Sequence, residues 1–236
     1  MTDIGRPDAG ATISEAAGLL RTDAAPDGAR LVLATRNRHK VVELRAILAD
    51  ALARDGVELD LDRAVVGVDA FPDVEDVVES GVTFEANALL KARAVAAGTG
   101  LPALADDSGL AVDVLGGAPG IFSARWSGRH GDDRANLELL LAQLADVPDE
   151  HRAAGFVCAA ALVHPGGNEH VELGHLRGML ERAPRGDNGF GYDPILRLDD
   201  DTRTLAELEP DEKNAISHRS RALRAIAPHL LAVLRA

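Results

Sequence analysis

The order of apolar segments along the chain constrains the fold more than any other feature. Residues 29–35 and 64–68 have the continuous apolar character of buried strands. A helix begins between them near Lys40, with its apolar face at residues 44, 47, 48, 51 and 52. A second helix is expected over 84–97, with Thr83 as its N-cap and Gly98 at its end.

The second half of the chain places strands next to one another. Residues 103–115 read as strand, turn and strand, and a helix follows over 134–145. Strands at 155–163 and 170–180 are joined by a short turn. A last helix covers 218–235, where Pro228 should kink or interrupt it. Alternating helices and strands followed by adjacent strands predict the α/β class with a mixed sheet.

Composition restricts the core and the partners. Aromatic residues make up only 3% of the chain, so Ala, Val, Leu and Ile must fill the interior. The formal net charge of -13 repels a polyanion, which argues against nucleic acid as a partner. It leaves room for a small anionic ligand in a local basic pocket. Cys158, the single cysteine, lies in an apolar run and is expected to be a buried thiol.

The first 29 residues differ from the rest of the chain. They are rich in Ala, Gly, Asp, Thr and Pro, so we expect residues 1–29 to be a flexible N-terminal extension and residues 30–236 to form one domain. They contain no long apolar stretch of the kind found in signal peptides, and no segment reaches membrane-spanning length. We therefore expect a cytoplasmic protein without a membrane partner.

Lysine is rare in this chain. Only Lys40, Lys91 and Lys213 occur among the 25 lysines and arginines, although arginine is used freely elsewhere. Since a compact ammonium and a planar guanidinium are not equivalent, the three lysines indicate positions to inspect, unless their number is chance.

A basic segment follows the first strand. Its side chains are candidates for binding phosphate at a helix N-terminus: Thr35, Arg36, Asn37, Arg38, His39 and Lys40. The glycine-rich Walker pattern is absent. The alternative is an ordinary basic loop with an asparagine cap.

Two adjacent aspartates occupy the segment 104–112. Side chains alternate along a strand, so Asp106 and Asp107 should point to opposite faces, and only one should face a given site. Upstream, Glu75 and Glu79 supply further carboxylates, and Mg²⁺ needs few of these because water and phosphate oxygens complete its shell. The alternative is a hairpin turn at Asp107–Gly109.

A glycine-rich loop over 187–194 contains two of the six Phe and Tyr residues. Glycine lets backbone approach a ligand, and Phe190 and Tyr192 offer faces on which a base can stack. The alternative is a hairpin whose aromatic side chains fill the core.

A second basic segment opens the last helix. Lys213, His218 and Arg219 are donors there, and Arg219 can bind carbonyl or phosphate oxygens with two N–H groups. A solvated basic helix start is the alternative. Lys91, on the 84–97 helix, would by itself be read as a surface lysine.

Taken in order, five segments resemble the inosine/xanthosine triphosphate pyrophosphatase family. They are "TRNRHK", "TFEANALLKA", "LADDSGLAVDVLGGAPGIFSARWSG", "GFGYDP" and "EKNAISHRSRAL". The resemblance extends from Leu31 onward and leaves residues 1–29 without a counterpart. Arg36 stands where the family's first motif often has glycine.

The resemblance implies a homodimer with an elongated mixed β-sheet flanked by helices and two lobes with a central cleft. It implies Mg²⁺-dependent hydrolysis of non-standard purine nucleoside triphosphates (ITP, dITP, XTP) to the monophosphate and pyrophosphate. Asp107 would be the catalytic carboxylate and a metal ligand, with Glu79 as the second metal carboxylate. Substrate would be bound by Thr35, Arg36, Asn37, Arg38, His39, Lys40, Lys91, Ser108, Phe190, Gly191, Tyr192, Asp193, Lys213, His218 and Arg219.

Two other functions stay open at this point. A related fold hydrolyses standard pyrimidine or methylated nucleotides, but the donors His218 and Arg219 favour a 6-oxopurine. A nucleotide-sensing module would bind a triphosphate without cutting it, and Asp107 with the three lysines argues against that.

Overall fold

One six-stranded sheet runs through the whole molecule in the computed structural model, which describes residues 25–36, 38–54 and 56–235. The strand order is β2-β1-β3-β4-β5-β6. The strands are β1 (Leu31–Leu33), β2 (Val65–Gly67), β3 (Ala103–Val112), β4 (Ala153–Val163), β5 (Glu169–Leu180) and β6 (Leu196–Leu198). β1 is parallel to β2 and β3, whereas β3, β4, β5 and β6 pair antiparallel, so the predicted mixed sheet is confirmed.

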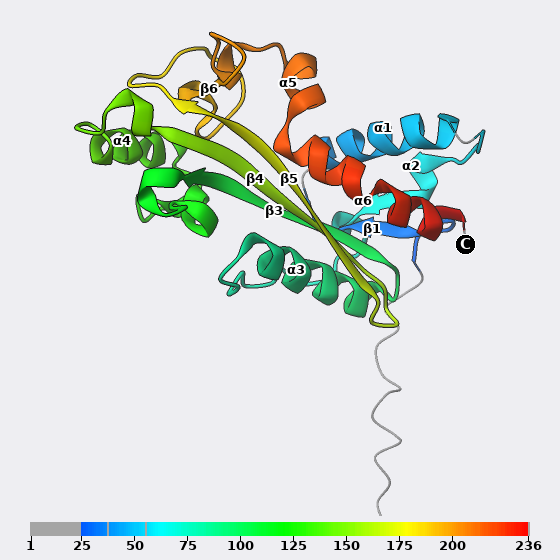
Figure 1. The fold of residues 1–236 in the computed structure, drawn as a ribbon. Coiled ribbons are helices and arrows are strands. Elements are labelled where there is room, and N and C mark those ends of the chain that lie inside the picture. The colour runs from blue at the N-terminus through cyan, green and yellow to red at the C-terminus, as the bar shows by residue number, and fades with distance from the viewer. Residues whose placement is uncertain (1–24, 37, 55, 236) are drawn as a thin grey trace, which may run out of the picture.

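Helices cover both faces of this sheet (Figure 1). They are α1 (Arg38–Arg54), α2 (Leu61–Ala64), α3 (Phe84–Thr99), α4 (Asp133–Gln143), α5 (Pro210–Ile216) and α6 (His218–Arg235). α1 and α6 pack on one face around Cys158 and Ala160, while α3 packs on the other around Ala159 and Ala161. Cys158 is fully buried, as expected.

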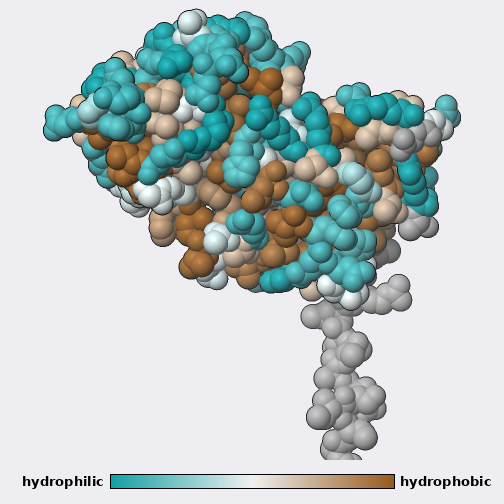
Figure 2. Space-filling model, viewed as in Figure 1, coloured by the Kyte–Doolittle hydropathy of each residue, from teal (hydrophilic) through white to brown (hydrophobic). Residues whose placement is uncertain are grey.

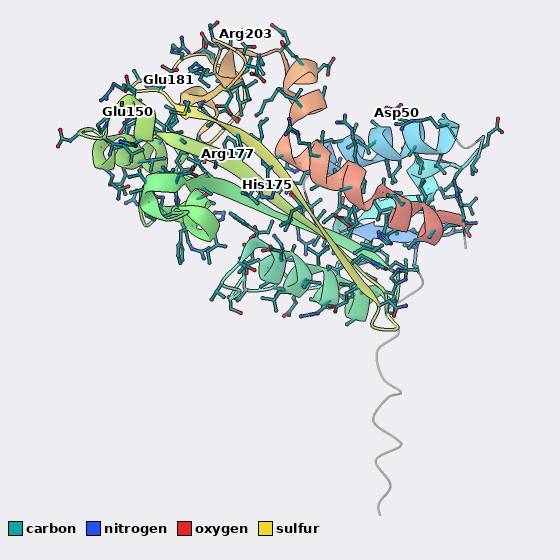
Figure 3. The ribbon with its side chains drawn as sticks, viewed as in Figure 1. Asp50, Glu150, His175, Arg177, Glu181 and Arg203 are labelled. Atoms are coloured by element: carbon teal, nitrogen blue, oxygen red, sulfur yellow. The ribbon has the colours of Figure 1, made fainter. Side chains whose placement is uncertain are left out.

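The two lobes are joined by the long strands β3, β4 and β5 (Figure 1). A third apolar cluster, which includes Leu110, Leu140 and Ile195, forms the core of the lobe that carries α4 and β6. Asp50 on α1 and Arg203 near β6 mark the opposite lobes in Figure 3, with His175 and Arg177 on β5 between them. Figure 2 shows the surface dipping between the part that carries α5 and the part that carries α1.

Small residues bring the helices close to the sheet. Ala88 and Ala92 of α3 are fully buried one helical turn apart. On β5, Gly174 lies against the start of α6, where an added Cβ would be 2.0 Å from the His218 carbonyl oxygen. A core poor in aromatics thus sets α3 and α6 directly on the strands that carry the carboxylates.

The strand–turn–strand prediction for 103–115 is wrong. β3 continues from Ala103 to Val112 without a break, and Asp107 pairs with Ala159 in the ladder with β4. Gly109 leaves room for the 3₁₀ helix Gly120–Arg125, because a Cβ at position 109 would be 2.4 Å from the Ser123 hydroxyl. Tertiary pairing therefore overrides the turn propensity of Asp-Ser-Gly.

Helix ends agree with the sequence in part. The Thr83 side chain accepts a hydrogen bond from the amide of Ala86, so the predicted N-cap is confirmed. α3 continues past Gly98 and ends at Gly100, which adopts a left-handed conformation with φ 69°. The basic segment near the C-terminus is split at Ser217 between α5 and α6, and Pro228 lies inside α6 without ending it.

Candidate active site

Asp106 and Asp107 separate the site into two halves. Their side chains project to opposite faces of β3, as the sequence predicted: Asp106 toward α1 and α6, and Asp107 toward α3. Both lie in the middle of β3, where Asp106 pairs with Ala160 and Asp107 with Ala159 of β4, so the β3–β4 ladder fixes their positions.

On the α3 face, two carboxylates meet one lysine. The Lys91 ammonium lies 2.7 Å from a Glu79 oxygen and 3.5 Å from a carboxylate oxygen of Asp107. Asn87, one turn before Lys91 on α3, donates from its side-chain amide to Asp107 at 3.1 Å. The Asn87 side-chain oxygen accepts from the amide of Gly81 at 2.8 Å, which ties the acidic segment to the helix.

These contacts shift the protonation equilibria. Burial raises the pKa of Asp107 above its usual value, with Lys91 opposing the shift and Glu79 adding to it. Burial would lower the pKa of Lys91, but Asp107 and Glu79 outweigh it and the pKa is raised. A charged lysine thus stays beside a carboxylate that is a better proton acceptor than an exposed aspartate.

The pair Glu79 and Asp107 fits a hard divalent cation. No group of three or more His, Cys, Asp or Glu side chains in the described part of the chain is arranged to hold a metal by itself. Mg²⁺ does not need such a group, because it commonly uses one or two carboxylates and takes its other ligands from water and phosphate. The adjacent pocket is lined by Ala34, Thr35, Arg36, Val68, Glu75, Asp76, Val77, Glu79, Lys91 and Val95.

On the other face of β3, Asp106 binds two positively charged side chains. The Lys40 ammonium donates to both Asp106 oxygens at 2.9 Å, and the Arg219 Nε donates at 3.1 Å. The Asp106 side chain is only 8% exposed. Burial would raise the pKa of Asp106, but Lys40 and Arg219 outweigh it and hold the pKa well below its usual range.

A larger pocket opens beside Arg219. It is lined by Glu43, Ser108, Gly109, Ser123, Ala124, Asp133, Phe156, Phe190, Gly191, Tyr192, Asp193, Lys213, Asn214, Ser217, His218 and Arg219. Eight of the predicted substrate residues, from Ser108 to Arg219, therefore lie around one cavity. We call it the base pocket, after the role that the sequence predicts for Phe190, His218 and Arg219.

Asp193 and Lys213 support the glycine-rich loop of the base pocket. Asp193 accepts from the amide of Phe190 at 2.7 Å and from the Lys213 ammonium at 2.5 Å. From the neighbouring helix α4, Asp133 accepts from the amide of Gly191 at 3.0 Å. These carboxylates fix the backbone on both sides of the Phe190 ring.

The two aromatic residues of this loop differ. The Phe190 side chain is 64% exposed, and the Lys213 ammonium lies 5.0 Å from its ring centroid. Tyr192 is buried, and its hydroxyl donates to the Ser123 carbonyl at 2.9 Å. The exposed Phe190 ring therefore has a face on which a base can stack. Tyr192 instead fills the core, which was the alternative interpretation of this loop.

His218 is buried in the wall of the base pocket. Its ring stacks on Phe156 with centroids 4.9 Å apart, and its Nδ1 has no hydrogen-bond partner among the described residues. Burial and the nearby Arg219 lower the pKa of His218 to about 3. The imidazole is therefore neutral near pH 7 and has one polar atom left for a ligand.

The basic segment 35–40 is only partly in the site. Arg36 is turned to the acidic segment, donating to Asp76 at 3.2 Å and to the Val74 carbonyl at 2.9 Å, and Arg38 is exposed. Asn37 and the side chain of His39 lie outside the described residues. Thr35 and Arg36 line the pocket beside Glu79 and Lys91, and Lys40 is connected to the site through its hydrogen bonds to Asp106.

Sequence reasoning missed seven polar or aromatic residues of the site: Glu43, Asn87, Ser123, Asp133, Phe156, Asn214 and Ser217. Asn87 carried a signal, since it lies four residues before Lys91 and so shares its helix face. Glu43 and Asp133 resemble ordinary exposed helix residues in the sequence, and Phe156 resembles a core residue.

Comparison with known proteins gives close relatives. The Ham1 family matches residues 31–229. A dITP/XTP pyrophosphatase of Streptomyces avermitilis is 65% identical over 199 residues, covering 84% of this chain and 96% of the relative. One from Nocardia farcinica is 55% identical, covering 87% of this chain and 96% of its own length.

Solved structures agree with the sequence relatives. A HAM1 protein from Coxiella burnetii is 40% identical with a TM-score of 0.77, covering 86% of this chain and 99% of that chain. A nucleoside-triphosphatase / dITP/XTP pyrophosphatase from Mycobacterium abscessus is 51% identical with a TM-score of 0.70, covering 84% and 99%. With the same fold and high identity over nearly the whole length of these relatives, this chain belongs to the Ham1 family.

Proposed function

We propose that this protein is a pyrophosphatase that hydrolyses the non-standard purine nucleoside triphosphates ITP, dITP and XTP to the monophosphate and pyrophosphate, and so cleans the nucleotide pool. One observation carries the proposal. Asp107, Glu79 and Lys91 form a cluster of two carboxylates and a lysine on one face of β3. On the other side of the strand lies the base pocket, whose lining includes polar donors. The names of the relatives support the same activity.

Asp107 and Glu79 are the side chains that would hold Mg²⁺. When bound, the ion neutralises phosphate charge and lowers the pKa of a coordinated water. Mg²⁺ is supported as the metal by the two-carboxylate donor set and by the phosphate chemistry.

Asp107 is also suited to accept a proton. In the proposed step a water oxygen attacks the α-phosphorus, its proton passes to Asp107, and the bond to the β-phosphate oxygen breaks to release pyrophosphate. The raised pKa of Asp107 favours this acceptor role. Lys91 and Lys40 stabilise the charge on the phosphates, and Thr35 lines the same pocket as Lys91.

The base pocket is proposed to bind a 6-oxopurine. The ring would stack on the exposed face of Phe190, and Arg219 would donate to the O6 acceptor. His218 would supply its neutral imidazole to the same edge. Adenine offers an amino group in place of O6, so these donors would be left unpaired at a cost of about 1–3 kcal/mol each.

We further propose that the protein acts in the cytoplasm as a homodimer. None of the helices in the described residues has both the length and the apolar content to cross a membrane. Three large apolar side chains near the β3 and α4 end are at least a third exposed: Val114, Phe122 and Leu139. Such side chains are compatible with a contact between two copies.

The test is an assay of pyrophosphate and orthophosphate released from ITP, XTP, dTTP and ATP with Mg²⁺. We expect pyrophosphate from ITP and XTP, and much less from ATP and dTTP. Comparable turnover of dTTP would favour the pyrimidine-specific alternative. Binding of ITP without release of either product would favour the sensing module.

A further inference from the structure

Asp106 joins the two ends of the nucleotide site. Lys40 comes from α1, Asp106 from β3 and Arg219 from α6, and the three side chains meet in a buried ion triplet. The Lys40 and Arg219 side chains are 26% and 16% exposed, and the carboxylate between them is 8% exposed. Each cation therefore keeps a side open to ligand while its inner side is bound to the same carboxylate.

No other carboxylate in the described residues binds both cations this closely. Glu43 approaches Arg219 at 3.9 Å, compared with 3.1 Å for Asp106. The Ser220 hydroxyl donates to Glu43 at 3.4 Å. Asp106 is thus the group that sets the distance between the Lys40 ammonium and the Arg219 guanidinium.

The triplet keeps one net positive charge in a partly buried place. Without Asp106, the two cationic side chains would face each other with only the more distant Glu43 carboxylate, 3.9 Å from Arg219, to compensate their charge, and the long side chains would move apart. With it, they are held in one arrangement before substrate arrives. Preorganised donors of this kind stabilise a transition state more than flexible ones.

We propose that Asp106 is a positioning residue that couples recognition of the base to binding of the phosphates. This inference rests on the proposed function, in which Arg219 reads the base and Lys40 contacts phosphate. A 6-oxopurine that satisfies Arg219 leaves the triplet undisturbed, so Lys40 stays aligned with the phosphates. A base that repels or fails to engage Arg219 shifts Asp106 and, through it, Lys40. Base identity is then expressed in kcat as well as in KM.

The test is a double-mutant cycle on kcat/KM for ITP. Lys40→Gln and Arg219→Gln are made singly and together, in the native protein and in the Asp106→Asn variant. In the native background, we expect the fold-loss in kcat/KM of the double variant to be about tenfold smaller than the product of the fold-losses of the two single variants. The reason is that either single change already releases the shared Asp106 carboxylate. In the Asp106→Asn background the two losses should multiply.

Asp106→Asn alone has a second readout. We expect kcat for ITP to fall about tenfold or more with a smaller change in KM, and the ITP-to-ATP ratio of kcat/KM to shrink. Asp106→Glu keeps the charge and should retain more of that ratio. A matched control is Asp113→Asn, which breaks the exposed ion pair with Arg177 and should leave both quantities unchanged.

Two results would overturn the proposal. One is that the fold-losses in kcat/KM of Lys40→Gln and Arg219→Gln multiply in the native background. This measurement does not need the Asp106→Asn variant, so it can be made even if that variant does not fold. The other is an ITP-to-ATP ratio in a folded Asp106→Asn variant equal to that of the native protein. If the native protein itself releases no pyrophosphate from ITP, the proposed function is wrong. That result is distinguishable from the two results that would overturn the role of Asp106.

Discussion

Neighbouring aspartates on β3 have opposite electrostatic environments. Asp106 has two close cations and a pKa well below its usual range, whereas Asp107 shares one lysine with Glu79 and has a raised pKa. The alternation of side chains along a strand accounts for this difference, since it gives each residue a different set of neighbours. One carboxylate is thereby kept charged as a fixed support, and the other is suited to proton transfer.

Asp107→Asn should abolish turnover without weakening the fold. The substitution removes the proposed metal ligand and proton acceptor, and we expect kcat for ITP with Mg²⁺ to fall at least about 100-fold. The melting temperature should stay the same or rise, because burial already disfavours the charge of Asp107. A variant with near-native kcat would show that another group accepts the proton.

His218 should make the protein less stable as the pH falls below about 6.5. The folded state keeps the imidazole neutral to about pH 3, whereas the unfolded state binds a proton near the ordinary pKa. The unfolded state therefore holds more protons between these values, so stability decreases with falling pH in that window. At pH 5 the loss from this group should be about 2 kcal/mol.

His218→Gln should remove that part of the pH dependence. Urea unfolding of both proteins at pH 7 and pH 5 measures it, because the difference between the two proteins cancels the titration of the other histidines. Equal losses of stability on going to pH 5 would contradict a buried neutral His218.

At the scale of elements, α6 depends on a glycine of β5. The close approach of Gly174 to the first turn of α6 places His218 and Arg219 at the edge of the base pocket. The backbone of both elements is involved, so there is no flexible side chain that can move aside.

Gly174→Ala should therefore displace the start of α6. Its Cβ would be 2.0 Å from the His218 carbonyl oxygen and 2.5 Å from the Ala222 amide nitrogen. We expect a loss of about 1–3 kcal/mol in the free energy of unfolding and a smaller ITP-to-ATP ratio of kcat/KM. Gly166→Ala, in the turn between β4 and β5 with open space around it, is the control and should change neither. An unchanged substrate ratio in the Gly174 variant would show that α6 tolerates the shift.

At the scale of the whole molecule, the sequence predicted the mixed sheet, the long strands β4 and β5, and eight of the sixteen residues that line the base pocket. Those predictions depend on periodicity and on motifs, which are local. It did not predict the unbroken β3, because the turn propensity of Asp107–Gly109 is local and the ladder with β4 that overrides it is not. It also missed Asn87 and Glu43, since nothing local separates a polar helix residue that faces a carboxylate from one that faces water.

The net charge should control self-association. Two copies that each carry a formal charge of -13 repel at long range, and salt screens this repulsion. We expect sedimentation analysis to give a mass twice the 24.8 kDa of the chain, with tighter association at about 0.3 M than at about 0.02 M salt. A mass of one chain at both salt concentrations would contradict the proposed homodimer.

The unbroken strand β3 has a consequence for the exchange of amide hydrogens with solvent. Catalytic residues often lie on loops whose amides exchange quickly through local opening. Here Asp107 lies in the middle of a ten-residue strand with β4 along its whole length. The amides of β3 that bond to β4 should therefore be among the slowest in the molecule, exchanging only when the sheet itself comes apart. The carboxylate that we propose as the proton acceptor would then belong to the last part of the protein to unfold.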